Sequence, residues 1–247
     1  LNGNVNFNGN AGNLTLNASG AITQSSGVIT NNDPASIATF AAGAANNIGL
    51  GGNNDFNEVR ITSGKDVTIN DVSNALKLGA STVSGNYSAT ATGGNITTTG
   101  ALALNGTTNS ITATGASFDV TLSNSITHNN ASASTLNLVG KQNIAIATGG
   151  SVAASGGTLA VTLNSDSDAT GGGAISMAPG TSISSNGGNI VLGGGATPGS
   201  VAAIGNAANP VGVLISGASL SSGTGDISIR GQGISVGAGT YGGVHIL

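Results

Sequence analysis

Acidic and basic side chains that lie close together are the first candidates for chemistry, because two facing carboxylates, one with a raised pKa, can cleave glycosidic bonds. Glu58, Arg60, Lys65 and Asp66 come closest together in this chain. An ion pair between the two arms of a hairpin-like corner accounts for these residues without catalysis. We therefore expect no catalytic residues and no enzymatic activity.

Other carboxylates sit at the ends of short segments in which apolar and small or polar residues alternate. Asp66 and Asp71 flank one such segment, and Asp119 and Asp226 begin two others. A polysaccharide-cleaving site would gather Asp with Arg and Lys on one face. Here the carboxylates are spread along the chain, which again predicts no catalytic site.

Metal ligands are equally sparse. Asp166 and Asp168 lie two apart, but a calcium loop needs more oxygen ligands in a fixed order, so we interpret them as a solvated turn. His128 lies in a polar segment that we expect to be a surface loop, and His245 in a strand. With no Cys in the chain, neither histidine has an evident partner ligand. We predict no metal.

No cofactor is predicted either. Residues 237–242 (GAGTYG) match the dinucleotide pattern GxGxxG. Glycine makes up 43 of the 247 residues, so a chance match is expected, and no helix follows to receive a pyrophosphate.

The composition excludes several classes of protein. Only 6% of the residues are charged, against about 25% in ordinary globular proteins. The mean hydropathy of +0.21 argues against disorder, and a collagen helix would need glycine at every third position. Five basic residues against nine acidic ones leave no basic stripe for phosphates, so we expect no nucleic-acid partner. No apolar run approaches the ~18–20 residues of a membrane-spanning helix.

The dominant pattern is an alternation of period two in short bursts that glycine or asparagine closes. Such bursts predict strands of three to five residues. The clear cases are residues 13–17, 58–62, 66–70, 119–123, 143–147, 159–163, 189–193, 212–216, 226–230 and 243–247. The residues expected to face inward are Leu14, Leu16, Val67, Ile69, Val120, Leu122, Ile144, Ile146, Leu159, Val161, Leu163, Ile190, Leu192, Ile227 and Ile229.

Short strands with small inward residues suit a coil whose opposite walls lie close together. The chain is therefore predicted to be all-β, an elongated parallel β-solenoid with short loop insertions, in which Gly and Asn take the corners. At about 20 residues per coil it would contain about 12 coils and extend for ~58 Å.

The chain is interpreted as a single solenoid segment, residues 1–247. Residues 12–23 resemble residues 85–97, and within residues 12–123 this internal similarity has a period of about 73 residues. From about residue 150 the repeat texture differs. Because Leu1 is not an initiator methionine, we expect the chain to be processed or to be a piece of a longer protein.

Four phrases resemble the repeats of filamentous-haemagglutinin-type exoproteins: residues 20–27 (GAITQSSG), 54–69 (NDFNEVRITSGKDVTI), 78–86 (LGASTVSGN) and 181–192 (TSISSNGGNIVL). The resemblance implies a right-handed parallel β-helix. It implies a two-partner-secreted adhesin at the bacterial cell surface, exported through an outer-membrane partner pore. In that family these repeats form the shaft, so the expected function is a non-enzymatic shaft that presents or spaces an adhesive or toxic tip.

Two alternatives remain open. The chain could bind a host-surface glycan or protein directly through corner loops, because recognition in solenoids concentrates in insertions. The segments least like strands are residues 31–36, 46–57, 125–134 and 193–210. Alternatively, the chain could associate with itself end to end as a surface filament, because an exposed end coil invites strand addition.

Overall fold

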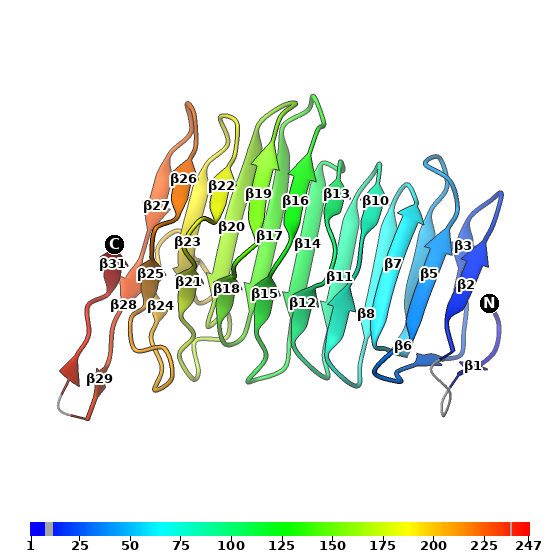
Figure 1. Cartoon of the computed structure of the whole chain (residues 1–247), viewed down its shortest axis with the longest axis horizontal. Coiled ribbons are helices and arrows are strands. Elements are labelled where there is room, and N and C mark those ends of the chain that lie inside the picture. The colour runs from blue at the N-terminus through cyan, green and yellow to red at the C-terminus, as the bar shows by residue number, and fades with distance from the viewer. Residues whose placement is uncertain (8–11, 238) are drawn as a thin grey trace.

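The chain forms a parallel β-helix whose coils stack along one long axis (Figure 1). The computed structural model describes residues 1–7, 12–237 and 239–247, and these contain strands and turns without a helix. The predicted all-β solenoid is confirmed. Among the described residues, no helix has the length and apolar character needed to cross a bilayer.

Three sheets form the walls of the stack, and each complete coil from Val67 onward contributes one strand to each of them. Sheet 1 contains β1 (Val5–Asn6), β3 (Ile22–Thr23), β4 (Ile29–Asn31), β6 (Ile48–Phe56), β8 (Val67–Asp71), β11 (Tyr87–Ala91), β14 (Thr108–Ala113), β17 (Ser134–Gly140), β20 (Leu159–Ser165), β23 (Ile190–Gly194) and β27 (Ile227–Ile229).

Sheet 2 contains β2 (Leu14–Asn17), β5 (Ile37–Ala41), β7 (Glu58–Ser63), β9 (Leu76–Leu78), β12 (Ile96–Thr98), β15 (Val120–Leu122), β18 (Ile144–Ile146), β21 (Ile175–Met177), β25 (Val213–Ile215) and β31 (Val244–Ile246). Sheet 3 contains β10 (Ser81–Val83), β13 (Leu102–Leu104), β16 (Ser125–His128), β19 (Ser151–Ala154), β22 (Ser182–Ser184) and β26 (Ser219–Ser221).

Two small pairings lie outside these sheets, in the C-terminal part of the chain. Strand β24 (Ala203–Ile204) pairs in parallel with β28 (Gly231–Gln232), and β29 (Ser235–Val236) forms an antiparallel hairpin with β30 (Gly239–Thr240). The hairpin overlaps the first part of the segment that matched the dinucleotide pattern, residues 237–242, of which residue 238 lies outside the described residues.

Alternation within each strand places one row of side chains inside the coil and the next row outside. In β8, Val67 and Ile69 are buried while Thr68 between them is exposed. Strands pair in parallel with the same phase, so Ile48 lies beside Val67 and Leu50 beside Ile69 on neighbouring coils. The core is therefore a set of columns of apolar side chains rather than a single central cluster.

Twelve of the fifteen residues predicted to face inward are buried, and Leu16 and Ile229 are half-buried against the core. Ile227 is the exception at 42% exposed. It stacks on Ile190, but β27 is the last strand of sheet 1, so no strand of the described residues pairs on its other side. The prediction that Ile227 is a core residue is wrong for this reason.

Coil lengths vary more than the sequence pattern predicted. Val59 is the register partner of Leu78 on the next coil, whereas Ile175 is the partner of Val213, and the second pair is twice as far apart in sequence as the first. Because the later coils are longer, sheet 2 has ten strands, so the prediction of about twelve coils is too high. Nine strand intervals correspond to a stack of about 43 Å at ~4.8 Å each.

The four segments expected to be loops differ in the structure. Residues 193–210 form a long insertion, and its only strand residues are the last two of β23 and the short strand β24. Residues 32–36 form a turn. The other two expectations are wrong in large part. Residues 48–56 form β6, the longest strand, and residues 125–128 form β16. The sequence of β6 is rich in Asn and Gly and does not show the usual alternation, because the pairing of β6 with β8 is irregular between Leu50 and Asn54. The sequence therefore predicts a loop at this strand.

The internal similarity within residues 12–123 does not follow the coils. It aligns β2 of sheet 2 (Leu14–Asn17) with residues 87–90, which belong to β11 of sheet 1. The two aligned strands therefore lie on different sides of the solenoid. Both begin after an asparagine, Asn13 or Asn86, whose Oδ1 atom accepts a hydrogen bond from a backbone N–H of the next coil.

Candidate functional site

Asn and Asp residues at the corners use their side chains to bind the next coil. Just before sheet 1, the Oδ1 atom of Asp66 accepts a hydrogen bond from the backbone N–H of Asn86 at 2.9 Å. The Oδ1 atom of Asn86 accepts one from the N–H of Thr108 at 3.0 Å. Each of these side chains thus accepts a hydrogen bond from the backbone of the following coil. We call such a residue a corner clamp.

A second column of corner clamps precedes sheet 2. The Oδ1 atom of Asn95 accepts from the N–H of Asp119, and that of Asp119 accepts from the N–H of Asn143 at 2.8 Å. The Oδ1 atom of Asn143 accepts in turn from the N–H of Ala174. Asp66 and Asp119, two of the carboxylates considered for catalysis, are therefore occupied with holding neighbouring coils together. Asp226 lies at a corresponding corner, where its N–H donates to Asn189.

The role of these clamps predicts the effect of removing one. Asp119→Ala would leave the half-buried N–H and Nδ2 of Asn143 without their acceptor, and we expect a loss of about 1–2 kcal/mol in the free energy of unfolding. Urea denaturation measures this loss. Asp119→Asn keeps an oxygen in place and should lose less. Equal losses in the two variants would show that the negative charge, rather than the acceptor, stabilises the corner.

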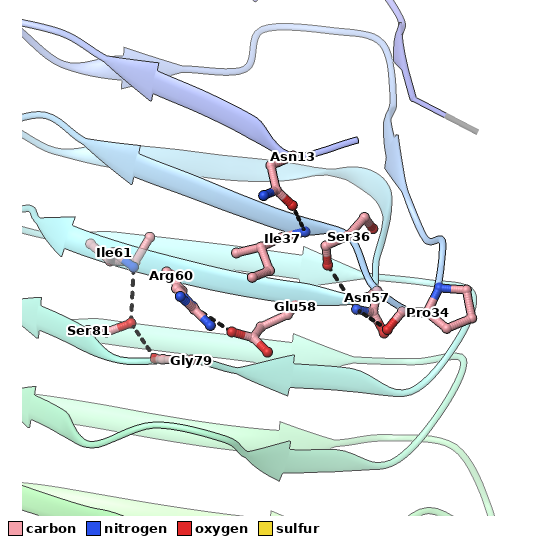
Figure 2. A network of polar contacts seen from close by, with 10 residues as sticks. All are labelled: Asn13, Pro34, Ser36, Ile37, Asn57, Glu58, Arg60, Ile61, Gly79 and Ser81. Atoms are coloured by element: carbon pink, nitrogen blue, oxygen red, sulfur yellow. Dashed lines mark hydrogen bonds and ion pairs between the residues drawn. The ribbon is translucent and has the colours of Figure 1, made fainter. Parts of the chain in front are cut away.

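The charged residues between positions 58 and 66 form two separate ion pairs, and Figure 2 shows the first of them, between Arg60 and Glu58. The Nε atom of Arg60 lies 2.6 Å from Oε1 of Glu58, two residues away on the same strand, β7. Lys65 pairs with Asp66 at 3.9 Å in the turn before β8. The expected hairpin-like corner joining all four residues is wrong, because Glu58 and Arg60 lie on one continuous strand, β7, and Lys65 and Asp66 lie in the turn that follows it.

Neighbouring polar groups in Figure 2 also connect coils. The Nδ2 atom of Asn57 donates to the carbonyl groups of Pro34 and Ser36 on the preceding coil. The hydroxyl of Ser81 accepts from the N–H of Ile61 and donates to the carbonyl of Gly79. These groups are internally satisfied, so the network strengthens the stack without leaving a free nucleophile or base.

A buried polar cluster fills the irregular part of sheet 1. The Oδ1 atom of Asn54 accepts from the N–H of Ile29 at 2.9 Å and from Nε2 of Gln24 at 2.7 Å. Its Nδ2 atom donates to Oε1 of Gln24 and to the carbonyl of Leu50. Asp71 lies beside Asn54 on the next coil and is also fully buried. The sequence pointed to Asp71 only as a residue flanking a strand.

The two histidines lie in different environments. His128 is 1% exposed, so its predicted place in a surface loop is wrong. It ends β16, where Nδ1–H donates to the carbonyl of Leu104 at 2.6 Å, while Nε2 is buried without a partner. His245 lies on β31 and is half-buried, in the strand that the sequence predicted. No three His, Asp or Glu side chains gather within the described part of the chain as a metal site would require.

Asp166 and Asp168 do not lie in a simply solvated turn, in contrast to their prediction. Asp166 is 1% exposed and has a positive φ of 48°, and its Oδ1 atom accepts from the N–H of Gly172 at 3.2 Å. Asp168 lies 3.6 Å from Nζ of Lys141. The carboxylates therefore shape and tether the insertion after β20.

A cleft lies between this insertion and the one after β23. Its volume is about 470 Å³, and Asp166, Thr170, Gly172, Asn206 and Ile234 are among the residues that line it. The amide of Asn206 is already engaged, because Oδ1 accepts from the N–H of Asn209 and Nδ2 donates to Asn143. The cleft is hollow enough for a small ligand, but its carboxylate and its amide are mostly used within the fold.

Comparison with known proteins identifies the repeats. A family model described as repeats of unknown function (DUF5649) matches residues 2–63 and 64–139. No curated protein and no solved structure matches the chain. The boundary between the matched segments falls between β7 and β8, and each segment contains three successive strands of sheet 2. One matched repeat therefore corresponds to about three coils.

Proposed function

The chain belongs to the family described as repeats of unknown function (DUF5649), and from this repeat architecture we propose that it is a non-enzymatic structural shaft. It would form part of a large secreted bacterial surface exoprotein and would present or space an adhesive or toxic tip. In its extended stack the strands of each coil pair only with strands of the neighbouring coils, which suits a spacer whose length is set by the number of coils.

The observation that carries this proposal is the use of polar side chains at the corners. Asp66 and Asp119, which have the chemistry for catalysis, bind backbone N–H groups of the next coil. A shaft needs this continuous reinforcement along its axis, whereas an enzyme needs such groups free and gathered in a cleft. The corner clamps therefore support a structural role for these carboxylates rather than a catalytic one.

Location and export are part of the same proposal. The resemblance to filamentous-haemagglutinin-type repeats supports secretion to the bacterial surface through an outer-membrane partner pore. The absence of Cys from the sequence supports it too, because an unfolded chain without disulfides can pass a narrow pore.

Duplication of whole coils tests the shaft directly. Val67, Tyr87, Asn109 and Leu136 are register partners on successive coils, so residues 67–135 comprise three coils. A chain in which this segment is repeated in tandem should keep its β circular-dichroism spectrum and lengthen by ~14 Å. Small-angle X-ray scattering measures the maximum dimension. A duplicated chain that gains mass without gaining length would refute the proposal.

A second candidate, direct adhesion, is favoured by the cleft between the insertions after β20 and β23. Replacing residues 196–209 by a short Gly-Ser turn should leave the β spectrum intact, because most of this segment lies outside the three sheets. Binding of the parent chain to a glycan array or to host cells, lost in this variant, would establish adhesion in place of a passive shaft. The shaft proposal expects no binding by either chain.

End-to-end association is the remaining alternative. Ile227, Val244 and Ile246 lie in the last strands of sheets 1 and 2 and are 42%, 38% and 68% exposed. Sedimentation at increasing concentration distinguishes a monomeric shaft from a self-assembling filament.

A further inference from the structure

Asp71 places a carboxyl group inside the solenoid, at the boundary between the two matched repeats. The residue is 0% exposed, and its Oδ1 atom accepts a hydrogen bond from the N–H of Phe56 at 2.7 Å. Its Oδ2 atom is buried without a partner. Phe56 belongs to the first matched repeat and Asp71 to the second, so this bond crosses the boundary.

The surrounding backbone explains why an acceptor is needed at this place. Strand β6 has two more residues than β8 between the pairs Leu50–Ile69 and Asn54–Asp71, so the ladder is irregular there. Two N–H groups near this irregularity, those of Ile29 and Phe56, donate to side chains of the next coil. Asn54 receives the first and Asp71 the second.

The two acceptors differ in charge. Asn54 uses an uncharged amide, and both polar atoms of that amide are hydrogen-bonded. Asp71 has the same role but can ionise, and its second oxygen lacks the donor that a buried carboxylate requires. An uncharged carboxyl group therefore fits this place better than a carboxylate.

No ion pair in the described residues supplies a positive charge that would stabilise the ionised carboxylate of Asp71. Strand β6 contributes Asp55, whose negative charge opposes a second one, and β11 places the uncharged Ala91 opposite Asp71. Burial raises the pKa of Asp71 to about 7, and the negative charge of Asp55 adds to the rise, while the hydrogen bond from the N–H of Phe56 and the nearby backbone N–H of Ser73 lower it.

We propose that Asp71 makes the boundary between the two matched repeats sensitive to pH, so that its uncharged carboxyl group holds the coils together and its carboxylate loosens them. The direction follows from linkage. Because the folded chain holds this proton more tightly than the unfolded chain, the stabilisation is complete below about pH 4 and is lost as the pH rises to about 7. This inference does not depend on the proposed shaft function.

Asp71→Asn tests the proposal, because it preserves an oxygen for the N–H of Phe56 and cannot ionise. In the parent chain, the opening equilibrium of the coils around Phe56 should increase by up to tenfold per pH unit between pH 4 and pH 7, relative to the variant. Hydrogen exchange of the β6 and β8 amides, corrected for intrinsic rates, measures this difference. Identical pH dependence in the two chains would overturn the proposal.

A matched control and a direct readout complete the test. Asp66→Asn removes a carboxylate that also binds the next coil but is 41% exposed, and it should leave the pH dependence in place. Infrared spectra of the parent chain at pH 6 should contain the C=O band of a protonated carboxyl group. Absence of this band would overturn the proposal even if Asp71→Asn failed to fold.

Discussion

Replacing Ile146 by Asp is expected to destabilise the fold by about 4 kcal/mol or more, because the variant loses a buried apolar side chain and gains an unpaired charge. Ile146 is 1% exposed and lies between Leu122 and Met177 on the neighbouring coils. Each coil of a solenoid depends on its neighbours, so the disturbance should extend to both sides. Urea denaturation gives the loss, and hydrogen exchange locates it.

The adjacent residue provides the control for this prediction. Ala145 lies on the same strand but faces outward, beside Thr121 and Ser176. Ala145→Asp introduces the same charge in contact with water and should cost less than about 1 kcal/mol. If the two variants unfolded at the same urea concentration, the assignment of inward and outward rows in sheet 2 would be wrong.

Asn54→Ala is expected to cost about 3 kcal/mol, because it removes several hydrogen bonds of a largely buried cluster at once and leaves the buried N–H of Ile29 without its acceptor. The N–H of Ile29 and the amide of Gln24 lose their acceptor, and the carbonyl of Leu50 loses a donor. Water cannot replace these bonds without entering the interior. Denaturant-induced unfolding followed by circular dichroism measures the loss.

Asn53 is the matched control, since it precedes Asn54 on β6 and its side chain is exposed. Asn53→Ala should change the free energy of unfolding by less than about 0.5 kcal/mol. A comparable loss in both variants would indicate that β6 requires asparagine for its backbone conformation and not for the buried cluster.

The strands and the architecture could be predicted from the sequence because they depend on local alternation. Val67 and Ile69, or Ile144 and Ile146, are separated by one small or polar residue, and all four are buried as expected. Small inward residues then exclude a thick sandwich and favour stacked coils. Both inferences depend on residue type and spacing alone.

The buried polar cluster could not be predicted in this way. Gly51, Gly52 and Asn53 in front of Asn54 have the composition of a turn, and only the neighbouring coils make them part of a strand. Gln24 and Asn54 lie on different coils, and no local pattern relates them. The burial of His128 has the same origin, because its partner Leu104 belongs to the preceding coil.

One signal for the corner clamps was present in the sequence. Asp66, Asn86, Asn95 and Asp119 each stand immediately before the first inward residue of a strand. That position indicates a corner, but the coil length is needed to identify the N–H group that each side chain binds. Coil length varies up to twofold along the stack, so the partners became clear only in the structure.

The variation in coil length has a consequence for design. Ile175 and Val213 are neighbours in sheet 2 although a long stretch of chain separates them, so the extra chain between them is accommodated without shifting the strand register. Evolution can therefore exchange such segments while the scaffold stays constant. The same corner would accept a foreign epitope, and a tandem array of these repeats would display copies of it at intervals fixed by the number of coils between them.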